Sequence, residues 1–107
     1  MPTTSEISQM MVQGFVPEKA DGINAIIQFD LSGDNGGQFY LDIKDGSVEA
    51  HDGMSDNAKM TLRAALDDYV AVASGQMNPM QAFMSGKIKI QGDMSLAMKL
   101  QTIFKSN

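Results

Sequence analysis

The single histidine and a few neighbouring acidic residues are the side chains of this sequence whose types suit acid–base chemistry. His51 stands beside Asp52, and histidine is a residue type that can act as a general base, but no motif places a nucleophile near it. Asp67 and Asp68 are adjacent, and adjacent residues of a helix diverge by about 100°, so they form no facing catalytic pair. We therefore predict no catalytic residue and no enzyme activity, and we interpret His51 as a solvated loop residue.

Acidic residues also occur among the glycines of residues 30–37. Asp30, Asp34 and Asn35 fall short of the D-x-[DN]-x-[DN]-G spacing of a calcium-binding loop. The chain contains no cysteine, which removes thiolate metal sites and disulfides. We expect no metal ion and no other cofactor, and we assign these glycines to turns.

Methionine is the residue type whose number and spacing most strongly suggest a binding function. The chain has 10 methionines among 107 residues, and methionine is an unbranched, polarisable side chain that adapts to apolar partners of varied shape. Met80, Phe83 and Met84 stand at i, i+3 and i+4, and Met94 and Met98 lie four residues apart. Each group therefore shares one side of a helix, where it either packs beneath a neighbouring segment or faces a common apolar space.

Hydrophobic periodicity and capping signals predict the elements that position these side chains. Apolar and polar residues alternate in several segments, as in strands with one buried face, and apolar residues recur at helical spacing in others. Thr3 to Glu6 fits a capping box, and Asp45-Gly46 is typical of a type I′ hairpin turn. We expect strands over 23–31, 39–44, 48–50, 58–63 and 87–91, helices over 3–14, 64–74, 79–85 and 94–104, and a short helical turn over 17–21.

The predicted fold class is α+β, with a five-stranded, mostly antiparallel sheet covered on one face by helices. The first three strands are joined by short turns and form an antiparallel meander. The last helix has a core face of about 120° that contains Leu96, Ala97 and Ile103, whereas Met94 and Met98 lie outside that face. A helix that only covers a sheet needs one apolar side, so the second side predicts contact with a further apolar partner.

Length, charge and composition limit the functional classes. A chain of 107 residues is predicted to form one domain, residues 1–107. Its net charge of -5, with eight basic and thirteen acidic residues, argues against a nucleic-acid partner. The N-terminal segment is polar and acidic, unlike a secretory signal, and no apolar run approaches the roughly 18 residues of a membrane span. Because the chain also lacks cysteine, we expect a soluble, cytoplasmic protein.

Three runs follow one another between residues 73 and 101: GQMNP from Gly75, AFMSGKIKI from Ala82 and GDMSLAMKL from Gly92. They resemble the signature region of the sterol carrier protein-2 (SCP-2) family. The family shows a G-K-[ML]-[ND]-P run, an A-F-x-x-G-K-[LI]-K-[LI] run and a G-[ND]-M-x-L-A-M-K-L run, in this order. The earlier helix, the INAIIQFDLSG strand, the K-D-G hairpin and the AKMTL strand also follow the family's order.

The resemblance implies an SCP2-like fold with a hydrophobic tunnel between the helices and the sheet. It also implies non-specific binding and transfer of lipids, including fatty acids, fatty acyl-CoA, phospholipids and sterols. The last helix lines the tunnel in this family. Peroxisomal members end in a targeting tripeptide that residues 105–107 do not match. The residues that we predict to contact lipid are Met60, Leu62, Met77, Met80, Phe83, Met84, Ile90, Met94 and Met98.

Lysines concentrate in the same third of the chain, and they have two interpretations. Lys87, Lys89 and Lys99 are either the solvated sides of a strand and a helix, or contacts for anionic headgroups and CoA phosphates at the tunnel mouth. The second interpretation predicts transient contact with a membrane surface.

Two functional hypotheses from different classes follow from this reading. The first is a lipid carrier without chemistry of its own. The alternative is an accessory or oligomerisation module of a separately encoded lipid-metabolising enzyme. A homodimer remains open under both hypotheses.

Overall fold

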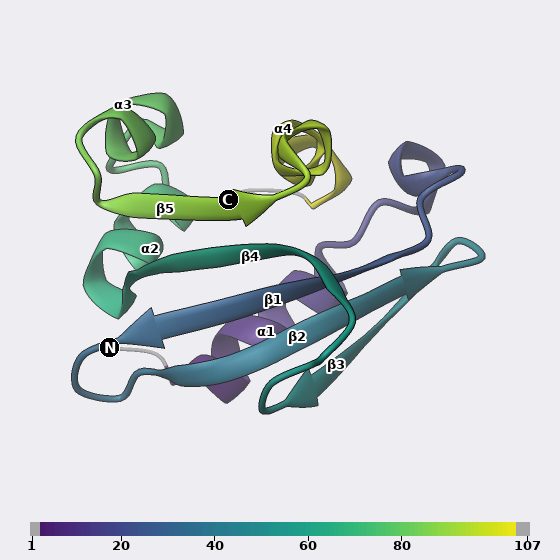
Figure 1. The fold of residues 1–107 in the computed structure, drawn as a ribbon, viewed down its shortest axis with the longest axis horizontal. Coiled ribbons are helices and arrows are strands. Elements are labelled where there is room, and N and C mark those ends of the chain that lie inside the picture. The colour runs from purple at the N-terminus through teal and green to yellow at the C-terminus, as the bar shows by residue number, and fades with distance from the viewer. Residues whose placement is uncertain (1–2, 105–107) are drawn as a thin grey trace.

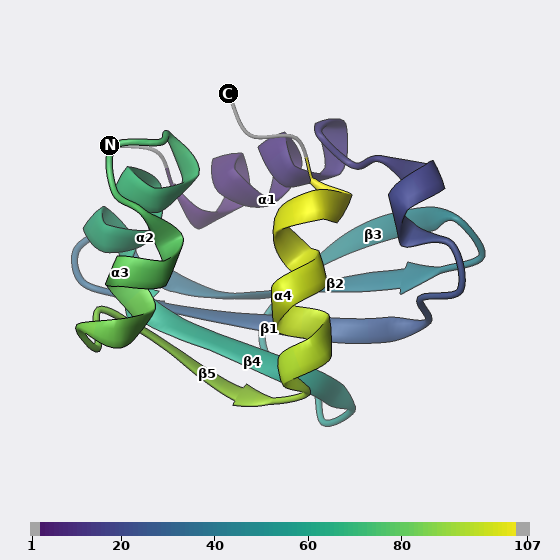
Figure 2. The same cartoon turned by 90° about the horizontal axis from the view of Figure 1, so that it is seen from above.

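The computed structural model describes residues 3–104, which form a five-stranded mixed sheet with helices on one face (Figures 1 and 2). The strand order is β3-β2-β1-β4-β5, so β3 and β5 are the edge strands. The predicted fold class is confirmed. The elements are α1 (Thr4–Gln13), the 3-10 helix η1 (Pro17–Ala20), β1 (Ala25–Ser32), β2 (Gly37–Lys44), β3 (Ser47–Asp52), β4 (Ala58–Ala65), α2 (Leu66–Ala73), α3 (Pro79–Met84), β5 (Ile88–Gly92) and α4 (Met94–Ile103).

Three of the four strand pairings are antiparallel, as the sequence predicts. Strands β1, β2 and β3 form the meander. Its second turn, between β2 and β3, contains Asp45 and Gly46, and both have positive φ, as a type I′ turn requires. The exception is the pairing of β4 with β1, which is parallel. After β3 the chain returns across the sheet to the far side of β1, and this long-range step brings β4 and β5 next to the meander.

The hydrophobic core lies between the sheet and the helices. Alternate residues of the strands face this layer, and Phe29 stacks on Phe39 with ring centroids 4.7 Å apart. Tyr69 of α2 meets the edge of the Phe29 ring at 5.8 Å, and its hydroxyl donates a hydrogen bond to the Met11 sulfur at 3.4 Å. Burial raises the pKa of the Tyr69 hydroxyl, because the phenolate would lose its hydration. Tyr69 therefore acts as a neutral core residue.

Gln28 alternates with Ile27 and Phe29 in β1, so the alternating pattern predicts a solvated side chain, and the structure differs. It points to the sheet face opposite the helices, yet it is buried, because the loop between β3 and β4 covers it. Its Nε2 donates to the Gly53 carbonyl at 3.0 Å, and its Oε1 accepts from the Ser55 backbone N–H at 2.8 Å. The side chain thus fixes the crossover loop to the sheet.

The end of α4 meets the segment after α1 on the helical side of the sheet. The Val16 N–H donates to the Ile103 carbonyl at 2.8 Å, and the Phe15 and Phe104 rings lie 5.7 Å apart. The end of α4 is therefore held by the segment that follows α1. The C-terminal residues compared above with a targeting tripeptide, 105–107, lie outside the described residues.

Candidate functional site

Helix α3 presents its methionines away from the sheet. Asn78 caps the helix, since its Oδ1 accepts from the Met80 N–H at 2.8 Å. Ala82 is the one buried residue of this six-residue helix, and its small side chain allows α3 to pack closely on β5. Met80 and Met84 lie on the opposite side of the helix and are 60% and 80% exposed, with Phe83 exposed beside them.

Helix α4 repeats this arrangement at the other end of β5. Asp93 caps it by accepting from the Leu96 N–H at 3.1 Å. The predicted core face is confirmed, because Leu96, Ala97 and Ile103 are buried. Met94 and Met98 lie outside that face and are 46% and 73% exposed. We call the exposed apolar side chains of the two helices the methionine surface; its members are Met80, Phe83, Met84, Met94 and Met98.

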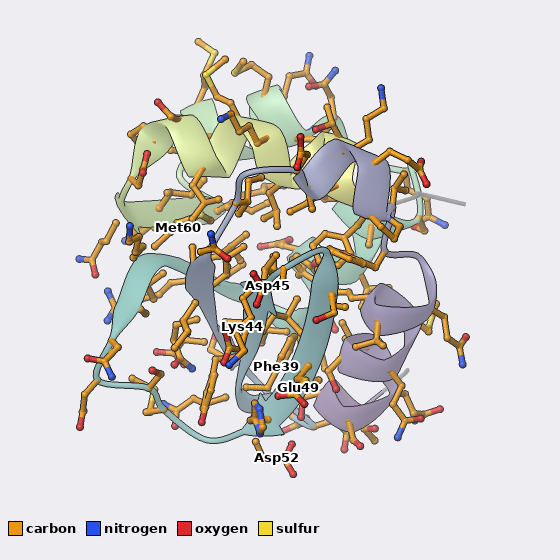
Figure 3. All side chains as sticks on the ribbon, turned by 90° about the vertical axis from the view of Figure 1, so that its right-hand side faces the viewer. Phe39, Lys44, Asp45, Glu49, Asp52 and Met60 are labelled. Atoms are coloured by element: carbon orange, nitrogen blue, oxygen red, sulfur yellow. The ribbon has the colours of Figure 1, made fainter. Side chains whose placement is uncertain are left out.

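The remaining residues of the predicted lipid site lie inside the protein. Met60 and Leu62 of β4 are buried beneath the helices, and Leu62 pairs with Ile90 of β5. Figure 3 shows Met60 at the interface between the sheet and the helical layer, where side chains fill the space. Met77 and Ile90 are half-buried and pack against the same core. The predicted residues therefore divide into an exposed group on the helices and a buried or half-buried group, which comprises Met60, Leu62, Met77 and Ile90.

An enclosed tunnel between the helices and the sheet is not shown by residues 3–104. Two hollows open instead near the start of β1, with volumes of about 270 and 370 Å³. Polar residues such as Asn24, Asp42 and Asp45 contribute to their walls, and neither includes a residue of the predicted lipid site.

The three candidate headgroup lysines are all exposed but do not share one side of the molecule. Lys89 alternates with Ile88 and Ile90, which face the helices, so it lies on the opposite face of the sheet. There it stands opposite Arg63, whose guanidinium lies 3.5 Å from Asp30. Lys99 is on α4 beside Met98. Lys99 is therefore the candidate whose position on α4 adjoins the methionine surface most directly.

The polar residues first considered for catalysis do not assemble a reactive site. His51 belongs to strand β3 and not to a loop, because β3 extends to Asp52; it is exposed, as predicted. Its Nε2 lies 3.6 Å from a Glu49 carboxylate oxygen, and its ring stacks on Tyr40 at 5.1 Å. Within residues 3–104, no three histidine or acidic side chains come close enough together to hold a metal ion.

The sequence pattern identified the methionines of α3 as candidate lipid contacts, but it did not predict that this helix has a single buried residue. Gly75 and Gly86 flank the helix with φ values of +84° and +80°, a conformation that favours glycine. Between them, Ala82 alone is buried. The sequence signal for this single buried residue was one alanine that lies opposite three larger apolar residues on a short helix.

The length and composition of the helices also limit how the chain can meet a membrane. Over the described part of the chain, no helix is both long enough and apolar enough to pass through a bilayer.

Two comparisons concern longer enzymes or enzyme-like proteins. Hydroxysteroid dehydrogenase-like protein 2 from Mus musculus is 45% identical over 80 residues, which cover 74% of this chain and 16% of that protein. The chain thus spans about a sixth of the length of this curated relative. The sec-alkylsulfatase Pisa1 from Pseudomonas sp. contains the same fold, with a TM-score of 0.86 at 16% identity, over 99% of this chain and 17% of that one.

Two further comparisons concern the domain itself. The sterol carrier protein domain 2 of Helicoverpa armigera is 30% identical, with a TM-score of 0.71, and the match covers 90% of this chain and 78% of that chain. A model of the SCP-2 sterol transfer family matches residues 11–105. Since this match includes nearly all of the elements described above, the chain belongs to the SCP-2 sterol transfer family.

Proposed function

We propose that the protein is a lipid carrier that binds the apolar chain of a fatty acid, a fatty acyl-CoA or a related lipid at α3, α4 and β5. The methionine surface is the observation that carries this proposal. Five large apolar side chains are exposed on α3 and α4, and exposed apolar surface of this kind marks binding sites. Membership of a sterol transfer family supports a lipid as the partner.

Entry of a lipid into the space between helices and sheet requires a covering helix to move outward. Met60 and Leu62 are buried, so a lipid reaches them only if a covering element is displaced. Helix α3 is the best candidate, since Ala82 is its one buried residue and glycines flank it. Each methylene that leaves water contributes about 0.8 kcal/mol, so about twelve methylenes provide about 10 kcal/mol toward opening this layer.

Headgroup contact is a second part of this proposal. Residues 77–100 contain three lysines and one aspartate, whereas the whole chain has a net charge of -5. The methionine surface therefore stands in the less acidic part of the protein, which favours anionic lipids and transient contact with an anionic membrane surface. Phospholipids and sterol-like lipids are further candidate ligands. The expected cytoplasmic location stays a prediction.

Displacement of a fluorescent fatty acid tests the carrier function. We expect saturable binding, and mass spectrometry of lipids extracted from the purified protein is expected to identify the natural ligand. Met98→Ser should weaken binding about fivefold, which corresponds to losing about 1 kcal/mol of apolar contact. Met54→Ser is the matched control, because Met54 is comparably exposed but lies on the loop between β3 and β4. Equal loss in both variants, or no saturable binding by the unmodified protein, would contradict the proposal.

Vesicle flotation tests the headgroup contact separately. Lys99→Gln should reduce binding to vesicles that contain phosphatidylglycerol, and added salt should remove the difference. Lys44→Gln is the control, since Lys44 is exposed at the β2–β3 turn, away from α3 and α4. Unchanged flotation of Lys99→Gln would remove the lysine from the site.

A second candidate function is an accessory or oligomerisation module for a separately encoded lipid-metabolising enzyme. The observation in its favour is that the matched regions of the mouse relative and of the Pseudomonas sulfatase each form less than a fifth of a longer chain. Copurification of an enzyme together with absence of fatty acid binding would favour this module over the carrier. Size-exclusion chromatography with light scattering would then distinguish a homodimer from a monomer.

A further inference from the structure

Sulfur in this protein occurs only as methionine thioether, because the chain has no cysteine. The exposure of these thioethers differs widely. Met80, Met84, Met94 and Met98 are exposed on the methionine surface, whereas Met60 is fully buried under the helices. Oxidation of methionine to the sulfoxide follows access to the sulfur and converts an apolar side chain into a polar one. The binding surface is therefore also the most oxidisable surface of the two helices.

We propose that Met80, Met84, Met94 and Met98 form a reversible oxidation site for hydroperoxides, at which a bound lipid hydroperoxide is reduced to its alcohol. This inference rests on the lipid-carrier function proposed above. A lipid held on the methionine surface brings its own hydroperoxide group close to several thioether sulfurs. The two pairs provide these sulfurs on neighbouring turns of α3 and of α4, four residues apart in each case.

The oxygen transfer balances without a further reactant. A lone pair of the methionine sulfur attacks the terminal oxygen of the hydroperoxide, and a sulfur–oxygen bond forms while the oxygen–oxygen bond breaks. The proton of the hydroperoxide group passes to the departing alkoxide, which leaves as the alcohol. The sulfur is oxidised by two electrons and the hydroperoxide is reduced by two. Hydrogen peroxide oxidises the sulfur in the same way, and its product is water.

Oxidation of this surface should also weaken lipid binding. The sulfoxide oxygen is a strong hydrogen-bond acceptor, and covering it with an acyl chain removes its hydration without replacing the lost hydrogen bonds. The other elements do not share this effect, because their exposed methionines lie outside the methionine surface. Reduction by methionine sulfoxide reductases reverses the modification.

The test compares a lipid hydroperoxide with hydrogen peroxide on the intact chain. Met10 on α1 and Met54 on the β3–β4 loop are the internal controls, because they are 55% and 54% exposed, close to the values for Met80 and Met94. Peptide mass spectrometry measures oxygen uptake at each methionine. With linoleic acid hydroperoxide we expect faster oxidation of the methionine surface than of Met10 and Met54; with hydrogen peroxide we expect similar rates at all exposed positions. Met60 should remain reduced in both arms.

The second readout is the affinity for a fluorescent fatty acid before and after oxidation. We expect at least about a tenfold loss of affinity and its recovery after treatment with the reductases. In the variant that combines Met80→Leu, Met84→Leu, Met94→Leu and Met98→Leu, affinity should no longer change on peroxide treatment, whatever its starting value.

Equal oxidation of Met10, Met54 and the methionine surface by the lipid hydroperoxide would overturn the directed transfer. Unchanged affinity after oxidation would overturn the effect on binding. In either case the carrier function stands if the untreated protein binds the fluorescent fatty acid, so the two proposals fail separately.

Discussion

Replacement of Gln28 by leucine tests how the crossover loop is held to the sheet. Gln28 is buried on the face that the helices leave open. Its Nε2 contacts the Phe39 and Gly53 carbonyl oxygens, both at 3.0 Å, and its Oε1 accepts from the Ser55 N–H at 2.8 Å. Leucine has a similar size but cannot make these hydrogen bonds, so Gln28→Leu removes every side-chain link between β1 and the loop.

The expected destabilisation follows from the lost hydrogen bonds. Each contributes about 0.5–1.5 kcal/mol net, and a buried donor left without a partner adds about 1–3 kcal/mol. The Ser55 N–H, a part-buried donor of this loop, loses its acceptor, although the greater apolarity of leucine offsets part of the cost. We expect the free energy of unfolding to fall by about 2–4 kcal/mol, a large share of the about 5–15 kcal/mol typical of a small domain.

Thermal and urea denaturation measure the loss of stability in Gln28→Leu, and hydrogen exchange shows where the loss occurs. For a domain of this size, 1 kcal/mol shifts the melting temperature by about 4–8 °C, so we expect a decrease of about 8–30 °C. Exchange of the Ser55 amide should accelerate more than exchange within β1. Gln38→Leu is the control, because its side chain is exposed on β2. If Gln28→Leu is no less stable than Gln38→Leu, the loop is not held by this side chain.

Three further experiments test other parts of the structure. Met60→Ala should lower the free energy of unfolding by about 2–5 kcal/mol, whereas Met98→Ala should change it by less than about 0.5 kcal/mol; equal effects in urea denaturation would place both side chains in the same environment. Gly92→Ala should cost about 1–3 kcal/mol by the same assay, because Gly92 has a φ of +101° and an added Cβ would collide with the Lys59 carbonyl. The Thr3 backbone N–H, and secondarily the Thr3 hydroxyl, lower the pKa of Glu6. The capping-box contribution is therefore present above the usual carboxyl pKa and lost as pH falls through the lowered pKa, and Glu6→Gln should remove this part of the pH dependence of thermal unfolding.

The local elements were predictable because their signals are local. The alternation in β1 and β2 and the type I′ turn at Asp45-Gly46 depend on neighbouring residues, and the structure confirms them. The core face of α4 was also predictable, since its arc is wide and its cap is clear.

Long-range features were not predictable in the same way. Gln28 reads as a solvated polar residue in β1, and its burial depends on a loop about twenty-five residues later that the sequence pattern does not position. The parallel pairing of β1 with β4 was not predictable either, because it joins strands that the local sequence pattern does not position relative to each other. The orientation of α3 depends on packing against β5, where Ala82 and not the larger Met80 or Met84 makes the close contact.

The position of the methionine surface has a physical consequence for how a carrier releases its ligand. Side chains that pack a core contribute to folding stability, so using them to bind a ligand requires part of the core to open. Met84 and Met98 are largely exposed, and covering them with a lipid gains apolar burial without first breaking a core contact. Met60 and Leu62 become available only when a covering helix is displaced. A lipid held by the exposed group alone should therefore exchange faster than one that also reaches the buried group, and the length of the acyl chain should determine which of the two occurs.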